Sequence, residues 1–221
     1  MKAVAYSESL AIDDPRALQD VELPEPVPGP RDLLVEVRAI SVNPVDTKVR
    51  RNTQPEAGQP KVLGWDVAGV VVGVGSEVSL FKAGDKVFYA GSIARAGGNS
   101  ERHLVDERIV GRKPRSLSFA EAAALPLTAI TAWELLFERL QLVEGQGAGQ
   151  QLLIVGAAGG VGSIMLQLAR QLTKVSVIAT ASRPETQAWA RELGAHHVID
   201  HSQPLHAELQ RAGFTSVSHV A

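Results

Sequence analysis

Cysteine is absent from this chain of 221 residues. Disulfide bonds and zinc sites with thiolate ligands are therefore excluded, and the composition suits a reducing compartment. Charge of one sign is not in excess either, because the formal net charge is only −2. A strongly basic surface for nucleic acid or for an anionic membrane is accordingly not expected.

Long apolar runs are also missing, although 45% of the residues are hydrophobic. The runs present are too short to cross a bilayer, so no membrane partner is expected. Met1 leads directly into a strand-like segment, and no secretory signal is visible, which favours a cytoplasmic location. The apolar content is sufficient for one large or two modest domains.

Residues 1 to about 115 have the pattern of an irregular β domain. Strands are expected at residues 2–6, 33–40, 67–74, 86–89 and 102–105. Closely spaced prolines between Pro24 and Pro30 predict a loop after the first of these strands. Gly73 and Gly75 are interpreted as part of a hairpin turn, and residues 81–85 as a second turn.

The second part of the chain alternates between helix and strand. Ser118 and Glu121 form the pattern of a capping box, and a longer helix is expected from Pro126 to Leu140. Further strands are expected at residues 151–155, 175–179, 197–199 and from 216, with helices at 184–193 and 204–212. This alternation predicts a parallel sheet with right-handed crossovers. We place the domain boundary near Leu125, which gives domains at residues 1–124 and 125–221.

The last five residues, 217–221, lie within an apolar strand pattern. A doubly wound sheet that ended there would expose an unpaired parallel edge. The doubly wound sheet is therefore expected to be incomplete at its C-terminal side.

The segment at residues 151–172 organises the rest of the chain. A short apolar run is followed by a glycine-rich turn and then by Val161, Ile164, Met165, Leu168 and Leu172 at helical spacing. A turn that follows a strand and opens a helix is the context in which backbone N–H groups bind the pyrophosphate of a dinucleotide.

The glycine turn matches the dinucleotide pattern G-x-G-x-x-G with one departure, an alanine in place of the first glycine. The residues predicted to bind the pyrophosphate are Gly156, Ala157, Ala158, Gly159, Gly160, Val161 and Gly162. An ordinary glycine-rich turn between two structural elements is the alternative.

The residues that follow the next strand indicate which nucleotide is bound. An NAD site has an acidic side chain about 20 residues after the turn, for the ribose hydroxyl. This chain has Ser182 and Arg183 there, and an arginine suits the 2′-phosphate of NADPH. Alternatively, Arg183 is only a solvent-exposed residue of the loop before the helix that begins at Pro184.

Several motifs together resemble the medium-chain dehydrogenase/reductase superfamily. They are Gly64-Trp65-Asp66-Val67-Ala68-Gly69, Phe81-Lys82-Ala83-Gly84-Asp85, Leu125-Pro126-Leu127-Thr128 and the glycine turn. Within it, the chain looks like the quinone oxidoreductase branch, whose members are often labelled zinc-type alcohol dehydrogenases. The resemblance implies a GroES-like β-barrel catalytic domain followed by an NADPH-binding Rossmann domain. Family members are longer, and many form homodimers through the edge of the Rossmann sheet.

The zinc of metal-dependent relatives is not expected in this chain. Those relatives bind zinc through cysteine and histidine, sometimes with glutamate, and Trp65 stands where they carry the histidine. The histidines His196, His197, His201 and His206 lie close together in the sequence, but they fall along a strand and loop beyond the glycine turn and are not interpreted as a metal site.

The resemblance assigns substrate contacts to residues 41–48. Asn43 would hydrogen-bond near the nicotinamide or the substrate, with Asp46 and Lys48 as polar neighbours. Alternatively, Asn43 caps a turn before Pro44.

Three further residues receive roles from the resemblance. Trp65 would form an apolar wall for a flat acceptor, with a core tryptophan as the alternative. Thr128 would contact the nicotinamide side, and His201 would lie near the adenosine phosphate unless it is only a solvated loop residue. No general acid is evident, so the proton is expected to come from water.

The predicted function is NADPH-dependent, zinc-independent hydride transfer to quinones or α,β-unsaturated carbonyls. Such acceptors are already electrophilic, whereas alcohol oxidation benefits from zinc. The alternatives are a non-catalytic NADPH-binding protein with a sensing, structural or RNA-binding role, and an inactive truncated fragment.

Overall fold

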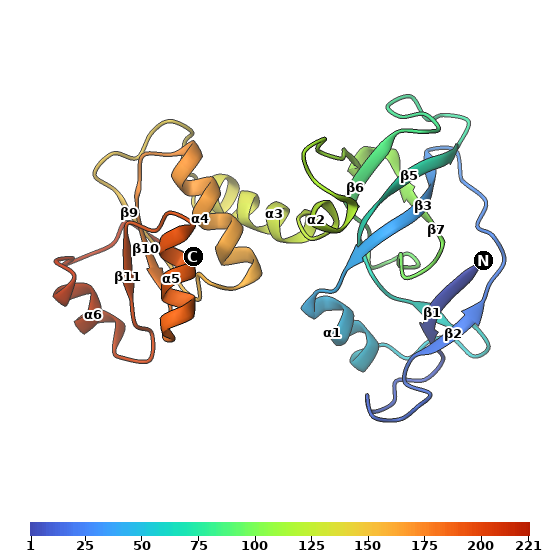
Figure 1. The fold of residues 1–221 in the computed structure, drawn as a ribbon, viewed down its shortest axis with the longest axis horizontal. Coiled ribbons are helices and arrows are strands. Elements are labelled where there is room, and N and C mark those ends of the chain that lie inside the picture. Colours follow the sequence, from blue (N-terminus) through green and yellow to red (C-terminus); the bar gives the residue numbers. More distant parts are fainter. The chain divides into compact units, whose positions relative to one another are not determined.

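The computed structural model describes all 221 residues of the chain. They form two compact units, Met1–Leu127 and Thr128–Ala221. Figure 1 follows the elements of each unit along the chain. None of the helices combines the length and the apolar character that crossing a membrane requires.

The first unit contains two antiparallel sheets. A three-stranded sheet has the order β2 (Gln19–Glu22), β1 (Lys2–Tyr6) and β4 (Lys61–Val62). A five-stranded sheet has the order β7 (Arg102–Asp106), β3 (Asp32–Ser41), β5 (Asp66–Val74), β6 (Lys86–Ala90) and β8 (Gly111–Arg112). The helical elements are α1 (Pro44–Asn52), the 3₁₀ turn η1 (Glu107–Ile109) and α2 (Phe119–Ala123).

Strand β3 shows why these segments fold as half-buried strands. Leu33 and Val35 are fully buried on one face, where they pack with Val67 and Val71 of β5. The side chain between them, Leu34, is only partly buried. This alternation is the pattern expected of an antiparallel sheet with one covered face.

The predicted capping box at the start of α2 is confirmed. The Ser118 N–H donates to the Glu121 carboxylate at 2.7 Å, and the Glu121 N–H donates to the Ser118 hydroxyl at 3.2 Å. Two N–H groups that the helix itself cannot satisfy are thereby paired.

The second unit contains a four-stranded parallel sheet. Its order is β11 (His197–Ile199), β10 (Ser176–Thr180), β9 (Gln151–Ile154) and β12 (His219–Val220). The helices are α4 (Gly160–Leu172), α5 (Pro184–Glu192) and α6 (Leu205–Arg211), preceded by α3 (Pro126–Trp133) and the π-helical turn η2 (Glu134–Arg139). Numbered from β9, the strand order is 3-2-1-4, which is that of a Rossmann sheet around its switch point.

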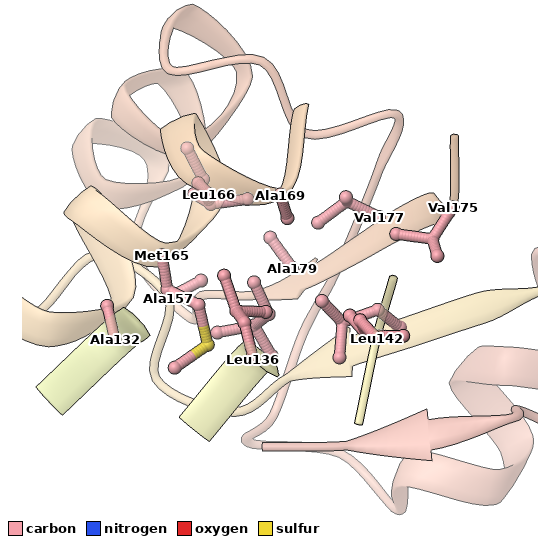
Figure 2. Close-up of a cluster of buried hydrophobic side chains, with 13 residues drawn as sticks. Ala132, Leu136, Leu142, Ala157, Met165, Leu166, Ala169, Val175, Val177 and Ala179 are labelled. Atoms are coloured by element: carbon pink, nitrogen blue, oxygen red, sulfur yellow. The ribbon is translucent and has the colours of Figure 1, made fainter. Parts of the chain in front are cut away.

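Both faces of the parallel sheet are covered, which explains the continuous apolar runs. Figure 2 shows Met165, Leu166 and Ala169 of α4 over Ala179 of β10. On the opposite face, Ile178 packs with residues of α6 and its flanking loop, among them Leu205, Leu209 and Phe214.

Two helices differ from their predicted form. The helix from Pro126 to Leu140 is not uniform, since the Leu140 N–H donates to the Leu135 carbonyl, five residues back, at 2.9 Å. In α4 the fully buried residues are Gly162, Met165, Leu166 and Ala169, whereas Val161, Ile164 and Leu168 of the predicted stripe are partly buried and pack against the same core. The predicted stripe thus contacts the core, and the centre of the buried face is shifted toward Leu166 and Ala169.

The segment after β3, in which no helix is predicted, contains helix α1. Its start has a recognisable signal: Asn43 at the cap, Pro44 in the first turn and Asp46 as the third helical residue. The strands β2 and β4 were also not predicted, because their polar residues show no apolar alternation.

Candidate functional site

The turn between β9 and α4 is held in place by Thr180, the last residue of β10. The Gly156 N–H donates to the Thr180 hydroxyl at 2.9 Å, and the Ala157 N–H donates to the Thr180 carbonyl at 3.2 Å. Gly156 has a φ of 68°, a backbone conformation that side chains with a Cβ rarely adopt. The turn is therefore shaped by one glycine and by two hydrogen bonds from the neighbouring strand.

Helix α4 begins unusually close to this turn. A Cβ at Gly162 would lie 2.6 Å from the Cα of Ala157 and 2.7 Å from its carbonyl carbon and oxygen. Only glycine allows this approach, which brings the first turn of α4 against the strand end. The first N–H groups of an α-helix have no intrahelical acceptor, so the start of α4 offers donors and partial positive charge.

A pocket of about 270 Å³ opens beside the glycine turn. Its lining combines the turn with residues at the end of β10 and in the segments that follow β10 and β11. The lining residues are Gly156, Ala158, Gly159, Thr180, Ala181, Ser182, Arg183, Thr186 and His201. The structure thus brings together six predicted cofactor residues that are up to 45 positions apart.

The charges around the pocket suit an anion. No acidic residue lines it, and Arg183 is exposed, with hydrogen bonds through its backbone but none through its guanidinium. His201 shares a hydrogen bond of 2.9 Å with the Thr180 hydroxyl through Nδ1, which leaves Nε2 without a partner in the chain. Both side chains can therefore meet a phosphate without breaking an existing contact.

The other predicted cofactor residues lie at the base of the turn and the start of α4. Ala157 is fully buried and belongs to the hydrophobic core of the second unit. Thr128 packs against the helix start, since its Cγ2 lies 3.2 Å from the position of a Cβ on Gly160. Thr180 was not predicted, because a threonine ending an apolar strand carries no signal of its own.

In the first unit, the predicted substrate segment forms a buried network of hydrogen bonds. The Asn43 N–H donates to Asp46 at 2.7 Å, and the Gly64 N–H donates to the other oxygen of Asp46 at 2.9 Å. The Asn43 side-chain amide donates to Asp66 Oδ2 at 2.8 Å, and the Leu127 N–H donates to Asp66 Oδ1 at 2.9 Å. Asp46 thus accepts hydrogen bonds only from backbone N–H groups, whereas Asp66 also accepts one from the side chain of Asn43.

The Asp66 carboxyl is nearly inaccessible, with 1% of the residue exposed. Burial raises its pKa to about 6, because removal from water disfavours the charged form. The hydrogen bonds from Asn43 and Leu127 act in the opposite direction, and the nearby Asp46 raises the pKa further. The motif at residues 64–69 contains Asp66 but predicts no role for it, since an aspartate that opens an apolar strand gives no indication of its partners.

The remaining two substrate residues differ in their surroundings. Trp65 is 4% exposed and packs with Tyr6 and Leu63, which favours the alternative of a core tryptophan. Lys48 is exposed on α1. Asn43 both begins α1 and lies within the buried network, so its predicted capping role and its predicted binding role are compatible.

The donor set expected for zinc is not present. There is no cysteine, Trp65 lies in the core, and both oxygens of Asp66 already accept hydrogen bonds. The histidines near the C-terminus have separate partners: His196 Nδ1 accepts from the Val177 N–H at 2.8 Å, and the His197 ring packs on Phe214. The residues present do not fit a zinc site.

Comparison with known proteins identifies the family. The model of the alcohol dehydrogenase GroES-like domain matches residues 29–133. A crystal structure of an NAD-dependent alcohol dehydrogenase is 30% identical, with a TM-score of 0.87, over 100% of this chain and 70% of that one. The chain belongs to the medium-chain dehydrogenase/reductase superfamily. The predicted fold class, a GroES-like domain followed by a Rossmann-type sheet, is confirmed.

Other relatives in the superfamily carry two kinds of name. A zinc-type alcohol dehydrogenase-like protein of Staphylococcus epidermidis is 39% identical over 100% of this chain and 65% of its own length. A Rhizobium etli structure, provisionally named a zinc-dependent alcohol dehydrogenase, is 60% identical, with a TM-score of 0.93, over 100% of this chain and 64% of that one. The Escherichia coli quinone oxidoreductase in complex with NADPH is 31% identical, with a TM-score of 0.83, over 98% and 64%. The chain thus spans less than two thirds of the length of these relatives.

Proposed function

We propose that the protein is an NADPH-dependent, zinc-independent reductase that transfers hydride to quinones or α,β-unsaturated carbonyls. In this proposal residues 1–124 form the catalytic domain and residues 125–221 the NADPH-binding domain. The observation that carries the proposal is the pocket beside the glycine turn, where Arg183 is the only permanently charged residue and no carboxylate is present.

The residues of this pocket fit a phosphorylated dinucleotide. The turn from Gly156 to Gly162 and the start of α4 suit a pyrophosphate, and Arg183 with His201 suits a 2′-phosphate. A carboxylate in place of Arg183 would instead suit the ribose hydroxyls of NAD. The similarity to a quinone oxidoreductase in complex with NADPH supports NADPH as the cofactor. The similarity to an NAD-dependent alcohol dehydrogenase makes NAD the alternative cofactor.

NADPH, when bound, supplies the hydride, and the task of the chain is to position the acceptor and keep water away. Orientation of two reactants can contribute about 7–11 kcal/mol to lowering a barrier. Asn43 is assigned a hydrogen bond to the nicotinamide or to the acceptor, and Thr128 a contact on the nicotinamide side. Because the residues do not fit zinc, the acceptor must already be electrophilic, as quinones and enones are.

Nucleotide affinity provides the first test. The affinities of the chain for NADPH and NADH are measured by fluorescence titration for the wild type, Arg183→Ala and Arg191→Ala. Loss of a charged hydrogen bond costs about 1.5–3 kcal/mol, so Arg183→Ala should weaken NADPH about 10- to 100-fold and leave NADH nearly unchanged. Arg191, an exposed arginine of the last turn of α5, is the matched control. Equal losses for the two nucleotides would refute the assignment of Arg183.

Turnover provides the second test. The longest natural form of the protein is mixed with NADPH and a panel of benzoquinones, naphthoquinones and enones, and the absorbance of the reduced nucleotide is followed. Oxidation of NADPH that persists after treatment with a chelator supports the proposal. If NADPH binds tightly but is not oxidised by any acceptor, the protein is instead a non-catalytic NADPH-binding protein. The lack of an evident acid–base pair supports this alternative.

A further inference from the structure

Asp66 connects two segments that are far apart in the sequence. Its Oδ2 accepts from the Asn43 side chain at 2.8 Å, across 23 residues. Its Oδ1 accepts from the Leu127 N–H at 2.9 Å, across 61 residues. Leu127 is the second residue of α3 and directly precedes Thr128. One carboxylate thus bonds both to the segment assigned to the acceptor and to the backbone at the start of α3.

The contacts of Asp66 differ from those of an ordinary structural carboxylate. Asp46, its neighbour, bonds only backbone N–H groups, from Asn43 and Gly64. Asp66 instead takes one hydrogen of the Asn43 carboxamide, which fixes which end of that side chain is the amide and which is the carbonyl. The two aspartates therefore have separate effects: Asp46 sets the backbone of Asn43, and Asp66 sets the orientation of its polar side chain.

We propose that Asp66 is a positioning residue that orients the Asn43 carboxamide and holds the backbone of Leu127, so that the segment assigned to the acceptor and the end of the first unit share one anchor. The catalytic part of this inference rests on the proposed function, whereas the coupling of Asn43 to Leu127 through Asp66 does not. A shift of about 1 Å in a positioning group can cost up to about 100-fold in rate.

The surroundings of Asp66 make its ionisation observable. Asp46 on α1 is the ionisable group whose charge acts on it, and the neighbouring strands place Ser41 and Ala90 opposite it. Leu127 contributes a backbone N–H. Since burial raises the pKa of the carboxyl to about 6, both hydrogen bonds should strengthen as the pH rises through that value.

The first experiment is a pH titration of the isotope-labelled wild-type chain by NMR. The signals to follow are the Asp66 carboxyl carbon, the side-chain amide protons of Asn43 and the backbone amide of Leu127. We expect all three to shift with one common midpoint near pH 6. If the Asn43 or the Leu127 signal does not follow the carboxyl, the two segments are not held by Asp66 and the proposal is wrong.

Two variants separate positioning from general stabilisation. Asp66→Asn keeps the shape of the side chain but removes the charge. Glu107→Gln is the matched control, because Glu107 is a fully buried carboxylate of the same unit that accepts the N–H groups of Ser79 and Leu80. Asp66→Asn should abolish the common titration of Asn43 and Leu127, and Glu107→Gln should leave it intact. Loss of the titration in both variants would overturn the proposal.

The kinetic consequence is measured on the same variants in the longest natural form of the protein. Asp66→Asn should lower kcat about 10- to 100-fold while the Kd for NADPH changes less than about threefold, because the anchor lies outside the nucleotide pocket. Wild-type kcat in Asp66→Asn would refute the positioning role even if the NMR titration succeeds. Absence of turnover in the wild type would refute the proposed function, and the NMR titration would still decide the coupling.

Discussion

Replacing Gly162 by alanine tests how rigidly α4 approaches the glycine turn. The new Cβ would lie 2.6–2.7 Å from three backbone atoms of Ala157, whereas ordinary contacts of this kind lie at 3.4 Å or more. Backbone cannot rotate out of the way as a side chain can, so the helix or the turn must move by roughly 1 Å in a close-packed region. Overpacking of this kind costs about 1–3 kcal/mol.

Alanine also favours helices over glycine by about 1 kcal/mol, which offsets part of this cost. We therefore expect a net loss of about 1 kcal/mol in the free energy of unfolding, or about 2–4 °C in Tm. The assay is chemical and thermal denaturation of the wild type and the variant. Gly160→Ala is the stability control, since it lies in the same helix and its Cβ would meet only the Thr128 methyl, at 3.2 Å.

The displaced backbone has a second consequence for the nucleotide. The N–H groups assigned to the pyrophosphate move with the turn, so Gly162→Ala should also weaken NADPH binding by about tenfold or more. If Gly162→Ala unfolds at the same free energy as Gly160→Ala, the close approach of helix and turn is not a rigid feature, and the structural reason for a glycine there fails.

The buried His103 should make the stability of the fold depend on pH. Burial lowers the pKa of its ring from 6.5 to about 4, because removal from water disfavours the charged form. The free energy of unfolding should therefore be highest above pH 6.5 and should fall by about 3 kcal/mol as the pH falls toward 4. The check is the free energy of unfolding of the wild type relative to His103→Gln from pH 7 to pH 4; a constant difference would contradict the assignment. Ser118→Ala should lower the free energy of unfolding by about 1 kcal/mol, because the hydrogen bond from the Glu121 N–H at the helix start is lost. Ser116→Ala, at an exposed position, should change it by less than about 0.5 kcal/mol, and urea denaturation measures both values. Glu107→Gln should lower the free energy of unfolding by about 1–3 kcal/mol, because this fully buried carboxylate accepts two backbone N–H groups. Glu77 pairs with the same arginine, Arg31, at the surface, so Glu77→Gln should cost less than about 1 kcal/mol. Equal losses for the two glutamates would show that burial does not set the difference.

Much of the fold could be read from local patterns. The strands at residues 2–6 and 197–199 have the predicted bounds, and the capping box at Ser118 begins the predicted helix. These features depend on apolar alternation and on side chains within three residues of each other, so neighbours in the sequence suffice to specify them. The helix start at Asn43 carried an equally local signal, but an asparagine before proline also suits a turn.

Other elements depend on pairing with distant residues. Strand β2 (Gln19–Glu22) is polar and mostly exposed, and it is extended because its backbone pairs with β1. The π-helical turn at residues 134–139 arises within a regular helical pattern, and the buried face of α4 is chosen by the sheet beneath it. None of these outcomes follows from the composition of the segment itself.

The candidate site divides in the same way. Order along the chain was enough to predict a glycine turn after a strand, with Arg183 at the end of the next strand, because a parallel sheet brings strand ends to one edge. Only the tertiary structure shows that Thr180 holds the turn and that Asp66 joins Asn43 to Leu127. A hydrogen bond across 61 residues leaves no periodicity in the sequence, since its geometry exists only after the chain has folded.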